Sequence, residues 1–120
     1  MPRTFALPAT LFALLIALLS PGNSPFAQQP QVWLETDRGP ILLALDNVST
    51  PVTTQNFLDY VNDGFYDGLI FHRVINGFVA QGGGFDGRLV QRPATRGAIP
   101  SEAGSGGANV PRTIAMALVG

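Results

Sequence analysis

Arg73 and Gln81 are the side chains of this chain whose chemistry stands out, because each lies within a short apolar run. The guanidinium group offers five N–H donors in a planar fork, and the glutamine amide can both donate and accept. No carboxylate lies between Asp67 and Asp86 to pair with the arginine, and an unpaired charge in apolar surroundings is costly. Two interpretations follow. Either a ligand pairs with Arg73, or its stem packs against the protein while the guanidinium reaches water.

Two strands joined by a tight turn are predicted to position these side chains. On the first strand, alternation places Arg73 on one face with Phe71 and Ile75. On the second strand, Gln81 shares a face with Val79. The pattern therefore places an arginine and a glutamine among apolar side chains.

The residues between and beside the two runs have simple interpretations. Asn76-Gly77 is typical of a two-residue type I′ hairpin turn, in which both central residues need positive φ. His72 alternates away from Arg73, which favours a structural histidine over an acid–base one. Residues 82–84 are three glycines without the Lys-Ser/Thr ending of a phosphate loop, which favours a tight bend over nucleotide binding.

Residues 71–85 resemble the signature of the cyclophilin-type peptidyl-prolyl cis-trans isomerases, which reads nearly Phe-His-Arg-Val-Ile-Pro-Gly-Phe-Met-x-Gln-Gly-Gly-Gly-Phe. The resemblance is long and specific, covers roughly residues 32–117, and is closest in style to bacterial secreted members. It continues into other parts of the chain at residues 51–57, 64–68, 101–103 and 113–117.

Site roles follow from the resemblance, position by position. It implies that Arg73 is the catalytic arginine, that Phe78 is a wall of the proline pocket and that Gln81 binds the peptide backbone. Val79 stands where the family usually has Met, and Ala117 is implied to be a groove residue. No metal site and no cofactor are implied.

Three positions depart from the family pattern. Asn76 replaces the usual Pro, which we expect to alter only the turn, and Leu118 replaces a polar residue, which removes a peptide contact. Pro111-Arg112 stands before Thr113 in place of the usual Arg-Gly.

The chemistry implied for Arg73 is modest. Rotation about an Xaa-Pro bond breaks amide resonance, with a barrier of roughly 18–20 kcal/mol. As the bond twists, the proline nitrogen gains a lone pair, so a fixed donor beside it stabilises the twisted state more than either planar state. Gln81 would hold the neighbouring carbonyl, and Phe78 with Val79 would anchor the ring.

The remaining elements are expected in the order hairpin, helix, hairpin, loop and strand, which suits a mainly antiparallel β fold. The resemblance sharpens this to a closed eight-stranded antiparallel barrel capped by helices, of which about five strands and one helix can be assigned. We expect a hairpin at residues 32–45, a helix from Pro51 to a stop at residues 62–64, a surface excursion at 86–107, and a last strand at 113–119. The chain ends directly after that strand, so we expect the domain of residues 32–120 to be incomplete at its C-terminus.

The first 27 residues have the pattern of a secretory signal, with Arg3 before an apolar stretch at residues 11–19 and helix breakers after it. Cleavage is expected after Ala27, with Ser24 as the other candidate, and an uncleaved anchor is the alternative. Residues 28–31 form a polar connector. The expected location is therefore outside the cytoplasm, most simply the periplasm, without stable membrane association after cleavage.

Composition excludes several other classes of function. The chain has no cysteine and one histidine, which argues against a disulfide framework, a zinc centre and a Ser-His-Asp device. All seven basic residues are arginines against eight acidic ones, so a nucleic-acid-binding surface is not expected.

The function predicted on these grounds is an exported prolyl isomerase that acts on proline-containing peptides and unfolded proteins, and that could also bind cyclosporin-type ligands. The alternatives are a non-catalytic peptide-binding or chaperone module and an inactive fragment of such an enzyme.

Overall fold

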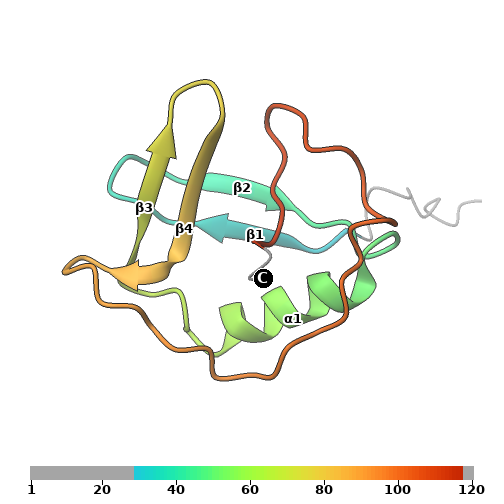
Figure 1. The fold of residues 1–120 in the computed structure, drawn as a ribbon, viewed down its shortest axis with the longest axis horizontal. Coiled ribbons are helices and arrows are strands. Elements are labelled where there is room, and N and C mark those ends of the chain that lie inside the picture. Colours follow the sequence, from blue (N-terminus) through green and yellow to red (C-terminus); the bar gives the residue numbers. More distant parts are fainter. Residues whose placement is uncertain (1–28, 118–120) are drawn as a thin grey trace, which may run out of the picture.

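The computed structural model describes residues 29–117 and places four strands and one helix in them. In chain order these are β1 (Gln31–Leu34), β2 (Ile41–Ala44), α1 (Pro51–Asn62), β3 (Leu69–Ile75) and β4 (Val79–Asp86). The strands form two separate antiparallel pairs, β1–β2 and β3–β4, and Figure 1 shows both hairpins above α1 and a long connection below it. The predicted order of hairpin, helix and hairpin is confirmed. The predicted signal sequence lies outside the described residues.

The first hairpin follows the predicted pattern. Val32 pairs with Leu43 on the face that turns inward, and Val32 is buried. Its turn is closed by a hydrogen bond from the Gly39 N–H to the Thr36 carbonyl, and Gly39 has a φ of 116°. β1 begins at Gln31, one residue before the predicted start of the domain.

Helix α1 begins and ends as the sequence predicts. Pro51 occupies the first turn, where its missing N–H costs nothing. At the other end Gly64 has a φ of 67° and donates to the Val61 carbonyl, while the N–H of Phe65 donates to the carbonyl of Tyr60. These two bonds form a Schellman ending, and the rings of Tyr60 and Phe65 pack edge-on across it with centroids 4.6 Å apart. Among residues 29–117, no helix is long and apolar enough to cross a membrane.

The core formed by the described residues is small. Its buried apolar side chains are Val32, Leu45 and Tyr60, and the buried polar side chain is Thr54, whose hydroxyl donates to the Asp46 carbonyl. Other large apolar side chains of the hairpins remain exposed, such as Trp33 at 58%. The described residues form two separate two-stranded sheets and one helix, and so few strands can enclose few side chains.

The connecting loop, residues 87–112, runs along α1 (Figure 1). Two arginines of this loop hold it to α1 and to the residues just after the helix. Arg92 donates to the carbonyl of Phe65, just after the helix. Arg96 forms ion pairs with Asp59, at 3.4 Å, and with Asp63. The predicted surface excursion is therefore confirmed as a loop, but it is held to the protein rather than free.

Glu102, also in the connecting loop, caps the N-terminus of α1. Its carboxylate accepts hydrogen bonds from the N–H groups of Val52, at 3.1 Å, and Thr53, at 2.8 Å. Thr50, at the N-cap position, makes no side-chain capping bond, so the loop supplies the acceptor that the local sequence does not. A negative charge at this end also complements the helix dipole.

This cap should make stability depend on pH in the acidic range. The hydrogen bonds from Thr53, and then from Val52, hold the pKa of Glu102 below its ordinary value. Because the pKa of Glu102 is lower in the folded state, the capping carboxylate stabilises the fold fully above the unfolded-state pKa of about 4.3. This stabilisation is lost as the pH falls through the folded-state pKa. We expect Glu102→Gln to lower Tm at pH 7 and the difference from wild type to shrink below about pH 4. Thermal unfolding monitored by circular dichroism between pH 3 and 7 measures this.

The matched control is Glu35→Gln, an exposed glutamate just after β1. It should leave the pH profile of Tm parallel to that of wild type. A Glu102→Gln profile equally parallel to wild type would contradict the capping role.

The predicted last strand, residues 113–119, is wrong over the part that the structure describes. Residues 113–117 are irregular, and residues 118 and 119 lie outside the described range. A strand exists through its ladder of hydrogen bonds, and within residues 29–117 no strand pairs with this segment. The described residues thus provide four of the five expected strands, and the closed eight-stranded barrel is not formed by them alone.

Arg112 lies in a turn that favours glycine. The N–H of Thr113 donates to the Val110 carbonyl at 3.2 Å, Pro111 precedes Arg112, and Arg112 has a φ of 72°. This is the arrangement of a type II turn, whose third residue needs positive φ. The departure from the usual Arg-Gly therefore introduces a strained residue.

We expect Arg112→Gly to raise the free energy of unfolding by about 0.5–1 kcal/mol, since relief of strain outweighs the greater freedom of glycine in the unfolded chain. Urea denaturation measures the change. Arg112→Ala separates the effect of backbone strain from that of the arginine side chain, because alanine removes the side chain but keeps the strained positive φ. Equal stabilisation by both substitutions would assign the effect to the arginine side chain instead.

Candidate functional site

The β3–β4 hairpin brings Arg73 and Gln81 together. The two residues are direct partners in the ladder, and Arg73 Nη1 donates to Gln81 Oε1 at 3.4 Å. Ile75 pairs with Val79 on the same face. The predicted juxtaposition of a guanidinium and an amide beside apolar side chains is thus present in the backbone register.

The turn of this hairpin lies at the predicted place but is of another type. Ile75 pairs with Val79, so three residues form the loop, and the N–H of Phe78 donates to the Ile75 carbonyl at 3.0 Å. Gly77 has a φ of 71°, whereas Asn76 is not in the positive-φ region. The type I′ prediction is therefore wrong. Positive φ at the third residue alone is the pattern of a type II turn, in which proline is also accepted at the second residue.

Arg73 is exposed, and its guanidinium reaches solvent as the second interpretation expects. Within residues 29–117 it forms no ion pair, and its one side-chain hydrogen bond is the one to Gln81. Gln81 is half-buried and uses its carbonyl oxygen for that bond, which leaves the amide NH₂ free to donate. The pair therefore offers several N–H donors on one face of the hairpin, and no carboxylate in the described part of the chain neutralises them.

Phe78 and Val79 lie at the turn end of the same hairpin. Phe78 is in the turn rather than on β4, and its side chain is 76% exposed. Val79 is the first residue of β4 and is half-buried. An exposed aromatic ring beside a group of hydrogen-bond donors can contact an apolar ligand ring, but the described residues do not form a closed pocket around it.

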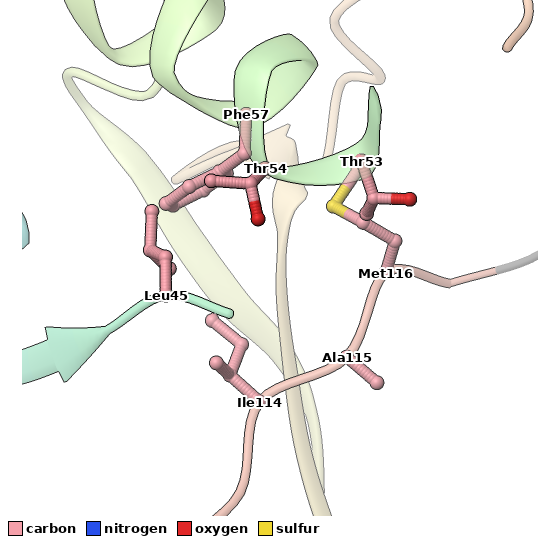
Figure 2. Close-up of a pocket in the computed structure, with 7 residues that line it drawn as sticks. All are labelled: Leu45, Thr53, Thr54, Phe57, Ile114, Ala115 and Met116. Atoms are coloured by element: carbon pink, nitrogen blue, oxygen red, sulfur yellow. The ribbon is translucent and has the colours of Figure 1, made fainter. Parts of the chain in front are cut away.

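Ala117 lies on a separate segment. It is exposed, and the residues just before it, Ile114, Ala115 and Met116, line a hollow of about 70 Å³ together with residues of α1 and Leu45 (Figure 2). The hollow is mostly apolar and contains none of the predicted site residues. It marks where the segment of residues 113–117 packs against the helix.

A bulge in β4 sits close to Gln81. Between the pairs Phe71–Gly82 and Ile70–Phe85, the two residues Gly83 and Gly84 have no partner on β3. Gly83 has a φ of 87°, and a Cβ added there would lie 3.1 Å from the ring of Tyr66. The three glycines that were predicted to form a tight bend lie within β4, where Gly83 and Gly84 form this bulge.

Tyr66 belongs to an aromatic cluster that joins α1 to this bulge. Its ring centroid lies 5.3 Å from those of Phe57 and Phe65 and 6.1 Å from that of Tyr60. Burial raises the pKa of the Tyr66 hydroxyl, with the neighbouring Tyr60 as a lesser cause. Sequence reasoning did not find this support for the site, because the aromatic residues interact through the fold and follow no local period.

The part of the chain that the structure describes has no cluster of side chains that could bind a metal ion. Residues 29–117 contain no group of three or more His, Asp or Glu side chains placed to hold a metal ion. The groups that the β3–β4 hairpin presents are the hydrogen-bond donors of Arg73 and Gln81 and the exposed ring of Phe78.

Comparison with known proteins agrees with the sequence motif. The family described as cyclophilin type peptidyl-prolyl cis-trans isomerase/CLD matches residues 31–120. The chain is 52% identical over 86 residues to peptidyl-prolyl cis-trans isomerase A of Dickeya dadantii, covering 72% of this chain and 45% of that protein. It is 46% identical over 86 residues to peptidyl-prolyl cis-trans isomerase B of Escherichia coli, covering 72% of this chain and 52% of that protein.

The chain thus spans about half the length of these curated relatives. The residues that match the family, 31–120, include Arg73, Phe78, Val79 and Gln81, which all lie on the β3–β4 hairpin.

Proposed function

Because the chain belongs to the cyclophilin-type peptidyl-prolyl cis-trans isomerase family, we propose that it accelerates rotation about Xaa-Pro peptide bonds and so assists protein folding. The observation that carries this proposal is the exposed Arg73 guanidinium, held opposite Gln81 on the β3–β4 hairpin without a carboxylate partner in the described part of the chain. The mainly β architecture with one helix agrees with the same family.

In the proposed mechanism the hairpin binds and polarises a twisted peptide bond. Arg73 donates toward the proline nitrogen as that nitrogen gains its lone pair, and the amide NH₂ of Gln81 donates to the neighbouring carbonyl. Phe78 and Val79 contact the proline ring, so that rotation is confined to one side of the bond. No covalent intermediate and no cofactor take part.

The substrates proposed are proline-containing segments of unfolded or flexible proteins. A cyclosporin-type ligand is proposed to compete for the same surface, since it would cover the hairpin face that carries Arg73. Ala117 is proposed as a further groove residue, and its exposure leaves it accessible to a peptide.

The second candidate is a peptide-binding module without isomerase activity. The exposure of Phe78, at 76%, favours it, because an exposed apolar side chain near donors suits an extended peptide without enclosing a proline ring. It differs from the first candidate in its dependence on Arg73.

We also propose that the protein acts outside the cytoplasm, in the periplasm. The supporting observation is the pattern of residues 1–27, a basic start followed by an apolar stretch and helix breakers. Expression with an epitope tag at the C-terminus, followed by fractionation of cells and N-terminal sequencing of the product, tests both export and cleavage after Ala27.

The function is tested by magnetisation-exchange NMR on an Ala-Pro peptide with the purified protein. Faster exchange between the cis and trans resonances, suppressed by a cyclosporin-type ligand, supports the isomerase. Binding of the peptide without faster exchange supports the peptide-binding module. Neither binding nor faster exchange by a protein with well-dispersed amide signals would contradict both.

A further inference from the structure

The pairing of Arg73 with Gln81 depends on two irregularities in the β3–β4 ladder. At the base of the hairpin, Leu69 pairs with Asp86 and Ile70 with Phe85. If this register continued without interruption, Arg73 would face Gly82, which has no side chain. In the structure it faces Gln81 instead, so the interruptions decide which residue the guanidinium meets.

One interruption lies on each strand. On β4 the unpaired residues are Gly83 and Gly84, and on β3 the unpaired residue is His72, between the pairs Phe71–Gly82 and Arg73–Gln81. Glycine-rich strands specify their register weakly, because they carry no side chains that could reject a shifted pairing. A specific contact is therefore needed to hold the two bulges in place.

His72 makes that contact. Its ring lies 4.6 Å from the ring of Phe85, centroid to centroid, at an angle of 56°. Phe85 is the first paired residue beyond the glycine bulge, so the contact joins the unpaired residue of β3 to the far side of the bulge in β4. Both side chains are half-buried.

No described hydrogen bond orients the His72 ring. Its Nδ1 is buried and has no hydrogen-bond partner among residues 29–117. The ring does contact Phe85, and an aromatic ring without polar atoms should be able to replace it in that contact.

We propose that His72 is a positioning residue, whose packing on Phe85 holds the double bulge and thereby places the guanidinium of Arg73 opposite Gln81. In this proposal it acts through Arg73 and not by contact with the substrate. Its effect on turnover rests on the proposed isomerase function, but its effect on the Arg73–Gln81 pair does not.

The test compares His72→Ala, which removes the ring, with His72→Phe, which keeps it. In each full-length protein the side-chain Nε–Hε signal of Arg73 and the NH₂ signals of Gln81 are followed by NMR, and kcat and KM are measured for an Ala-Pro peptide. Val74→Ala is the control, since Val74 is the exposed neighbour on the same strand. If His72→Ala does not fold, His72→Leu replaces it, because leucine keeps apolar bulk without a ring.

We expect the ring-removing variant to shift the Arg73 and Gln81 signals and to lower kcat about tenfold with KM little changed, because a misplaced donor affects the twisted state most. His72→Phe should restore both. Signals in the ring-removing variant that match those of Val74→Ala would overturn the proposal, as would a His72→Phe variant as impaired as the ring-removing one. If wild type shows no isomerase activity, the proposed function fails while the NMR signals still decide the positioning role.

Discussion

Arg73→Ala should lower kcat/KM for an Ala-Pro peptide by roughly 10²-fold or more, because removal of a single preorganised donor in comparable sites costs about that much. The stability of the protein should change by no more than about 0.5 kcal/mol. Arg73 is exposed, and its one described side-chain bond is a long hydrogen bond of 3.4 Å to Gln81. Magnetisation-exchange NMR and urea denaturation of the same preparations measure the two effects.

Two control variants make this result specific. Arg73→Lys keeps the charge but not the planar fork, and should recover little of the activity if the donor geometry is what matters. Arg38→Ala removes another exposed arginine, one that pairs with Asp37 in the β1–β2 turn, and should leave turnover unchanged. An Arg73→Ala protein that retains most of its turnover would instead support a peptide-binding surface whose function does not depend on this residue.

Gly83→Ala should lower the free energy of unfolding by about 2 kcal/mol or more. Its φ of 87° lies in a region that other residues occupy at a cost of about 1–3 kcal/mol, and the added Cβ would lie 3.1–3.2 Å from two ring atoms of Tyr66. That ring is held by the aromatic cluster around it, so it cannot move aside cheaply. Urea denaturation measures the loss.

Gly84→Ala is the matched control for this substitution. Gly84 lies next to Gly83 in the same bulge, has no positive φ, and a Cβ there would meet nothing within 4 Å. It should cost less than about 0.5 kcal/mol. Equal losses at the two positions would show that the bulge tolerates no side chain at all, and would remove Tyr66 from the explanation.

Much of the local structure could be predicted because short-range chemistry determines it. Pro51 and Gly64 mark the ends of α1, and Gly77 marks the turn between β3 and β4, since each has a backbone preference that few other residues share. The predicted type I′ for the β3–β4 turn is wrong because Asn76 tolerates both signs of φ, so its presence does not specify a positive φ. The prediction of a last strand is wrong over residues 113–117, because an apolar run becomes a strand only where another strand pairs with it.

At the candidate site, too, the sequence predicts the local features but not the pairing between the strands. The motif around Arg73 and Gln81 predicted the chemical groups, and simple alternation placed both of them in the hairpin. Alternation could not reveal that His72 is unpaired, or that the register shifts at the glycines so that Gln81 rather than Gly82 meets the guanidinium. The contact that we propose to hold this arrangement, between His72 and Phe85, joins residues thirteen positions apart and follows no period.

The sequence by itself determined the family, the order of the elements and the residue types at the candidate site, because these depend on a specific motif and on local backbone preferences. Only the tertiary structure revealed that Glu102 caps the N-terminus of α1 and that Arg96 holds the connecting loop to the helix. Glu102 lies about fifty residues from the N–H groups that it accepts from, and Arg96 more than thirty from its aspartates. Such contacts between distant residues arise only once the chain has folded, since nothing in the local pattern of either partner specifies the other.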